Sequence, residues 1–220
     1  MTKNSRELIF ARINKGADHV RADPEAGHRD RKNSLPSVDI TKTLAVLKED
    51  LESTSSDLLL LNDRHELGNT LIRCFEKLGV KKAVIFDGEM PEGGDLRKNW
   101  QKDNKISSHF ELLFGGGTAR FLDDVDVCVT GCWSIVAEGG VCIVESSSES
   151  GRLSSLLPPH HIVVSERSAL VHRLEDVVDG IKTSKSSFVF ISGPSRTADI
   201  EKQLVLGVHG PLSLTVIILP

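Results

Sequence analysis

Residues with the means to bind an anion gather near the end of the chain, in the run FVFISGPSRTADIEKQLVLGVHGP (residues 188–211). This run predicts a buried strand at 188–191, a tight turn of small residues, and a short helix with an apolar stripe at Ile200 and Leu204. A turn that leads into a helix start leaves backbone N–H groups free, and the helix dipole adds positive charge there. We therefore expect a small-anion site at this strand–turn–helix connection.

The side chains around the turn suit an anion as well. Arg196 offers a planar guanidinium that matches a carboxylate or a phosphate, and Gly193 lets the backbone approach a ligand closely. The alternative is a pair of ordinary loops around a helix cap, with Arg196 bound to surface carboxylates. The run contains neither a P-loop nor a GxGxxG fingerprint. The expected anion-binding residues are Ser192, Gly193, Ser195, Arg196, Thr197, Arg152 and His209.

One carboxylate is a candidate for catalysis. Glu138 stands in a short element between the apolar runs 125–129 and 141–144, just before Gly139 and Gly140. A carboxylate there can act as a base or a nucleophile if burial raises its pKa. The alternative is a Glu138 that is tied to backbone amides or to an arginine.

Metal ligands are not indicated by the cysteines or the histidines. The chain has four cysteines, Cys74, Cys128, Cys132 and Cys142. They form no CxxC pair and no ferredoxin-like run. His160 and His161 are adjacent, so in an extended chain they point in different directions. We expect no metal site and no cofactor bound by this chain, and we expect one of these histidines at the edge of the core.

Strand and helix patterns alternate along most of the chain, which predicts an α/β fold with a mostly parallel sheet and right-handed crossovers. In one helix we expect Asp63 and Glu66 as a capping box and Gly79 as the end. Strands are expected at 57–61, 80–86, 125–129, 141–144, 162–164, 188–191 and 214–219, and helices near 40–51, 67–78, 96–101 and 170–180.

Residues 1–37 differ from the rest. A short helix is predicted at 5–13, and residues 14–37 are polar, mixed in charge and without a period, as in a linker. We expect one domain at 38–220. The net charge of −4 gives no reason to expect nucleic-acid binding. The absence of a signal-peptide pattern and of a long apolar run favours a cytoplasmic protein that does not enter membranes.

Three blocks resemble a known family. They read TGCWSIVAEGGVCIVE (130–145), GRLSSLLPPHHIVV (151–164), and SGPSRTADIE followed by GVHGP (192–211). In their order and spacing they look like the lactate-utilisation protein C family, the LUD domain. The family usually has Thr-Gly-Thr after the glutamate, where this chain has Gly139, Gly140 and Val141. The loss of both hydroxyls puts any family role of that turn in doubt.

The resemblance implies a Rossmann-like three-layer α/β/α fold of the NagB/RpiA/CoA-transferase-like type. It also implies a subunit, without a redox centre of its own, of the system that oxidises L-lactate to pyruvate. Iron–sulfur clusters would then lie on partner proteins, and Arg196 with Arg152 would hold a small carboxylate. A homo-oligomer is a further option.

Other functions remain open on the same superfold. One is a free-standing CoA-transferase-like enzyme with Glu138 as nucleophile. Another is a phosphosugar-isomerase-like enzyme with Ser195 and Arg196 as the phosphate clamp. The third is a non-catalytic scaffold whose N-terminal segment docks partners.

Overall fold

The computed structural model describes residues 39–115, 122, 124–146, 153–183, 187–194, 196–198, 204–206 and 210–220. The α-helices are α2 (Ile40–Ser53), α3 (Leu67–Leu78), α4 (Gly93–Trp100), α5 (Asn104–His109) and α7 (Glu175–Thr183). The 3-10 turns are η3 (Arg64–Glu66), η4 (Asp87–Glu89), η5 (Leu153–Ser155) and η6 (Arg167–Ala169). The strands are β1 (Asp57–Leu60), β2 (Lys82–Ile85), β3 (Glu111–Phe114), β4 (Val127–Gly131), β5 (Ser134–Val136), β6 (Val141–Ser146), β7 (His160–Glu166), β8 (Leu170–Val171), β9 (Ser187–Ile191), β10 (Arg196–Ala198), β11 (Leu204–Leu206) and β12 (Ser213–Leu219).

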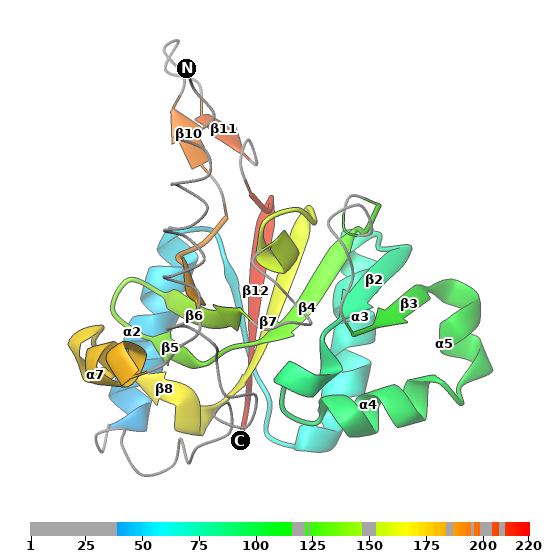
Figure 1. The fold of residues 1–220 in the computed structure, drawn as a ribbon, viewed down its shortest axis with the longest axis horizontal. Coiled ribbons are helices and arrows are strands. Elements are labelled where there is room, and N and C mark those ends of the chain that lie inside the picture. Colours follow the sequence, from blue (N-terminus) through cyan, green and yellow to red (C-terminus); the bar gives the residue numbers. More distant parts are fainter. Residues whose placement is uncertain are drawn as a thin grey trace, which may run out of the picture.

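Six of these strands form a parallel sheet in the order β1-β12-β7-β4-β2-β3 (Figure 1). Its central strands are apolar without alternation, because both faces are covered. Residues 127–129, 162–164 and 216–219 are completely buried. The predicted α/β class with a mostly parallel sheet is therefore confirmed.

Helices cover both faces of this sheet, which gives the predicted Rossmann-like three-layer arrangement. On one face, α3 and α4 pack side chains such as Phe75 and Trp100 against Val129 and Ile162. On the other face, α2 inserts Leu47 and Leu51 among residues of β7 and β12. Figure 1 shows α3, α4 and α5 beside β2 and β3, and α2 on the side of β5, β6 and β8.

A second sheet, in the order β8-β5-β6-β9, continues from two strands of the first. The chain passes from β4 into β5 and from β7 through η6 into β8, so the parallel pair β4–β7 continues as the parallel pair β5–β8. The Ser134 hydroxyl donates to the Ala169 carbonyl at this transition, over 2.8 Å. The second sheet packs on α2 with one face and on α7, through Val177, with the other.

The prediction of a helix after residue 195 is wrong. Residues 196–198 and 204–206 are the strands β10 and β11, and they pair antiparallel, with Thr197 opposite Val205. An isolated helix of this length is marginal unless an apolar face is packed. The run Leu-Val-Leu at 204–206 serves equally well as a strand, and the pairing decides between the two. Ile200, the other residue of the expected stripe, lies outside the described residues.

Smaller departures concern the start of the last helix and the N-terminal region. Leu170 was expected at the start of a helix but belongs to strand β8, and α7 begins at Glu175. The predicted N-terminal helix and linker lie outside the described residues, so the division at residue 37 stays a prediction. No helix in the described part of the chain has the length and apolar character needed to cross a bilayer.

Candidate functional site

The Ser192–Gly193 turn directly follows β9 and lies against two other elements. The Ser192 hydroxyl donates to the Gly139 carbonyl over 2.7 Å. Gly193 has a φ of +84°, and a Cβ at this position would overlap the side chain of Thr54, just beyond α2. Glycine is therefore required at residue 193 both by its backbone conformation and by the close approach of α2.

Glu138 lies in the turn between β5 and β6, next to the Ser192–Gly193 turn. Its backbone N–H donates to the His172 carbonyl over 3.0 Å. Its carboxylate accepts a hydrogen bond from Arg173 Nε over 3.2 Å, and His172 Nε2 lies 3.5 Å from the same oxygen. The two carboxylates that Arg173 binds, Glu138 and Glu175, raise the pKa of its guanidinium. The carboxylate of Glu138 is half exposed and paired with an arginine, which is the alternative that the sequence left open.

The glycines that follow Glu138 hold this turn against α2. Gly139 and Gly140 both have left-handed backbone, with φ of +85° and +57°. The Gly139 N–H donates to Asp50 of α2 over 2.6 Å, and a Cβ on Gly140 would press on Leu51. Two successive left-handed residues favour glycine strongly. The Glu138 turn, the end of α2 and the Ser192 turn thus form one junction.

The other predicted anion ligands are not brought to this junction by any described contact. Arg152, Ser195 and His209 lie outside the described residues. Arg196 and Thr197 belong to β10, so the backbone there is extended and offers no helix dipole. The strand–turn–helix site is corrected to a strand–turn–strand connection, and any positive charge must come from side chains.

The adjacent histidines behave as the extended backbone predicts. His160 Nδ1 bonds the Ser213 hydroxyl over 2.7 Å, at the edge of the core. His161 is buried, and its Nε2 bonds the Thr130 hydroxyl over 2.9 Å. Burial lowers the pKa of His161 to about 4, so the imidazole is neutral near pH 7. Within the described ranges, no group of three or more His, Cys, Asp or Glu residues is placed to hold a metal ion.

Two cysteines are inert members of the core. Cys128 and Cys142 are completely buried, and the loss of solvation raises the pKa of each thiol well above its usual value. A buried thiol of raised pKa is a weak nucleophile and a weak metal ligand.

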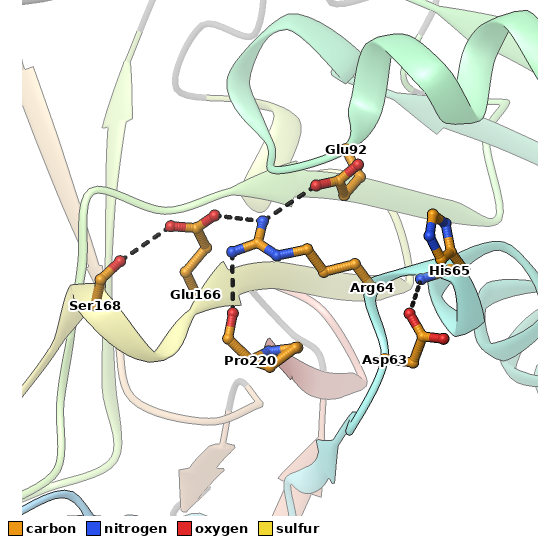
Figure 2. Close-up of polar contacts among 7 residues, drawn as sticks. All are labelled: Asp63, Arg64, His65, Glu92, Glu166, Ser168 and Pro220. Carbon is orange, nitrogen blue, oxygen red and sulfur yellow. Dashed lines mark hydrogen bonds and ion pairs between the residues drawn. The ribbon is translucent and has the colours of Figure 1, made fainter.

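A charged cluster that the sequence does not predict lies where the parallel strands end (Figure 2). Arg64 Nη1 donates to Glu166 over 2.7 Å and to Glu92 over 3.1 Å. Its Nη2 donates to the Pro220 carbonyl over 3.0 Å, and Ser168 donates to the other oxygen of Glu166. We call Arg64, Glu92, Glu166 and Ser168 the carboxyl-edge cluster. The hydrogen-bonded carboxylates raise the pKa of Arg64, Glu166 having the larger effect.

Comparison with known proteins gives the family. The model of the LUD domain matches residues 44–219. The lactate utilization protein C of Shouchella clausii is 40% identical over 189 residues, which cover 80% of this chain and 78% of that protein. Its counterpart in Oceanobacillus iheyensis is 26% identical over 205 residues, covering 89% and 87%.

A solved structure shows the same fold. The crystal structure of a DUF162 family protein from Deinococcus radiodurans superposes with a TM-score of 0.59 at 18% identity, over 84% of this chain and 100% of that one. The family model alone spans most of the chain, from α2 to the end of β12. The chain therefore belongs to the LUD domain family.

Proposed function

We propose that this chain serves lactate utilization and binds a small carboxylate, lactate or pyruvate, at the junction of the Glu138 turn and the Ser192–Arg196 segment. The relatives named lactate utilization protein C support the first half of the proposal. The observation that carries the second half is the hydrogen bond from Ser192 to Gly139, because it brings together the two segments expected to bind and to react.

A small carboxylate is negatively charged, so the junction must supply positive charge to bind it. With strands in place of the expected helix, the positive charge has to come from a guanidinium. Arg173 is already engaged by Glu138 and Glu175. This leaves Arg196, at the start of β10, as the residue proposed to hold the carboxylate, with Arg152 and His209 as further ligands.

Oxidation of lactate to pyruvate removes two electrons and two protons, so an electron acceptor is required. We assign this role to iron–sulfur partner proteins, as the family resemblance implies, and we give this chain the role of binding and orienting the carboxylate. Glu138 is then the group placed to accept a proton, since its carboxylate is half exposed and held in position by Arg173.

Calorimetric titration with L-lactate and with pyruvate tests the binding step. Arg196→Ala is expected to weaken binding about tenfold or more, because a charge-assisted hydrogen-bonded pair is lost. Arg73→Ala is a matched control, since Arg73 is exposed on α3 and bonds only its neighbour Thr70 among the described residues. Absence of binding by the unaltered protein, or equal affinity of the Arg196→Ala variant, would overturn the proposal.

A CoA-transferase-like enzyme is the second candidate, favoured by the same half-exposed Glu138 beside Ser192. In such an enzyme a carboxylate oxygen attacks the acyl-CoA thioester and the CoA thiolate leaves. Incubation with acyl-CoA followed by mass spectrometry would then reveal a covalent adduct on Glu138 that the Glu138→Gln variant lacks. An unmodified protein under these conditions eliminates this candidate.

A further inference from the structure

Glu138 uses only one of its two carboxylate oxygens in contacts with the protein. Arg173 Nε donates to Oε1 over 3.2 Å, and His172 Nε2 lies 3.5 Å from the same oxygen. Within the described part of the chain, the other oxygen, Oε2, makes no hydrogen bond or ion pair. The side chain is half exposed, so Oε2 is left for a ligand.

Backbone hydrogen bonds fix the place of this carboxylate. The Glu138 N–H donates to the His172 carbonyl over 3.0 Å, which extends the pairing of β5 with β8. The next residue, Gly139, donates its N–H to Asp50 and accepts at its carbonyl from Ser192. Because the backbone is held on both sides of the turn, only the rotation of the Glu138 side chain remains to be set.

His172 and Arg173 set this rotation. The Nδ1 atom of His172 is buried and has no hydrogen-bond partner among the described residues. A proton on Nδ1 would be an unsatisfied buried donor, which is costly. The neutral ring therefore carries its proton on Nε2, the nitrogen that faces Glu138. Two N–H donors are thus directed at Oε1, and neither occupies Oε2.

We propose that His172 and Arg173 orient Glu138 so that Oε2 selects a 2-hydroxy acid over the matching 2-oxo acid. This inference rests on the proposed function, in which Arg196 holds the carboxylate of the ligand. An ionised carboxylate only accepts hydrogen bonds. The hydroxyl of L-lactate can donate to Oε2, whereas the carbonyl oxygen of pyruvate is itself an acceptor and is repelled. The site then holds the substrate of lactate oxidation more tightly than its product.

Calorimetric titration of the full chain with L-lactate and with pyruvate measures the ratio of the two dissociation constants. The unaltered protein is expected to bind L-lactate about tenfold or more tightly than pyruvate, because only L-lactate forms a hydrogen bond to the charged acceptor. In Glu138→Gln the two affinities are expected to become nearly equal, since an amide both donates and accepts. Glu175→Gln is the matched control, because it removes the exposed carboxylate that also binds Arg173 and is expected to keep the preference.

Two variants of His172 test its positioning role. His172→Phe keeps a ring but loses the Nε2–H donor, so the preference for L-lactate is expected to fall about threefold or more. His172→Gln offers an amide nitrogen in place of Nε2 and is expected to restore the preference. A change in packing alone would weaken the binding of both ligands equally and leave the ratio as it was. Circular dichroism checks that each variant is folded.

The outcomes separate this inference from the proposed function. No binding of either ligand by the unaltered protein overturns the proposed function and this inference with it. Equal affinity for the two ligands, or tighter binding of pyruvate, overturns the inference alone. The same holds for an unchanged ratio in Glu138→Gln or His172→Phe, for a His172→Gln variant that behaves as His172→Phe does, and for a preference lost in Glu175→Gln.

Discussion

Two adjacent glycines at the start of α4 have opposite requirements. A Cβ on Gly93 would overlap the carbonyl oxygen of Asp87 in η4, whereas a Cβ on Gly94 would meet nothing within 4 Å. Gly93→Ala is therefore expected to lower the free energy of unfolding by roughly 3 kcal/mol, since backbone has to move. Gly94→Ala is expected to leave it unchanged or raise it by up to about 1 kcal/mol through helix propensity. Urea unfolding of both variants measures the difference, and equal effects would contradict the close packing of η4 on α4.

The buried His161 makes stability depend on pH. Burial lowers its pKa from 6.5 to about 4 in the folded state, so below pH 6.5 the unfolded chain binds the proton more tightly than the folded one. The stabilisation that the neutral His161 gives is therefore present above pH 6.5 and is lost as the pH falls toward 4. The free energy of unfolding falls by about 2 kcal/mol at pH 5 and by about 3 kcal/mol once the pH is below 4.

Urea unfolding at pH 7 and pH 5 tests this titration. His161→Gln keeps a hydrogen-bonding group for Thr130 and cannot titrate, so its stability is expected to fall less between the two pH values than that of the unaltered protein. The carboxylates contribute equally to both proteins and cancel in the comparison. An equal fall in both would show that His161 does not titrate as its burial requires.

At this scale the sequence predicts local features and misses distant ones. The opposite directions of His160 and His161 follow from the extended backbone and are confirmed. Arg64 could not be found in this way, because its partners are separated from it by 28, 102 and 156 residues. Pairings of this kind depend on the order of strands in the sheet, and a single sequence gives no local signal for them.

The transition between the two sheets depends on one buried hydroxyl. Ser134 opens β5, is almost fully buried, and donates to Ala169 in the connection that leads to β8. Ser134→Ala leaves that carbonyl without its donor, so the free energy of unfolding is expected to fall by about 1 to 2 kcal/mol. Ser107→Ala, whose hydroxyl bonds an exposed carbonyl within α5, is the matched control and is expected to change it by less than about 0.5 kcal/mol. Equal values for the two variants would contradict the role given to Ser134.

Predicted helices and strands are confirmed where end signals and long apolar runs agree. Gly79 ends α3 with a left-handed φ of +68°, as predicted. Asp63 accepts from the His65 N–H but caps η3, and Glu66, the N-cap of α3, makes no side-chain cap bond, so the expected capping box is realised only in part. Short elements fare worse. Leu170 and Val171 form a strand because they pair with β5. The segments 196–198 and 204–206 form strands in place of a helix because they pair with each other. In both cases the pairing partner, which the local pattern does not contain, decides the conformation.

At the scale of the whole molecule, the described core begins with α2. Every buried cluster is built from residues within the span matched by the LUD domain, 44–219. Asp39 caps α2 by accepting from the Lys42 N–H, so the helix has its own start signal at the boundary expected from the sequence. The alternation of strands and helices predicted the parallel sheet. Of the second sheet, the strands β6 and β9 were predicted at 141–144 and 188–191, whereas the short strands β5 and β8 and the separation into two sheets were not.

Deletion of residues 1–37 tests the remaining prediction about domains. Since no described core residue is removed, the melting temperature of the 38–220 chain is expected to stay within about 2 to 4 °C of that of the full chain, which corresponds to about 1 kcal/mol for a protein of this size. If the N-terminal segment is a docking arm, the shortened chain will no longer capture iron–sulfur partner proteins of lactate utilization in a pull-down, while the full chain does. Capture by both chains would assign partner binding to the LUD domain itself, and a large fall in melting temperature would show that the segment completes the fold.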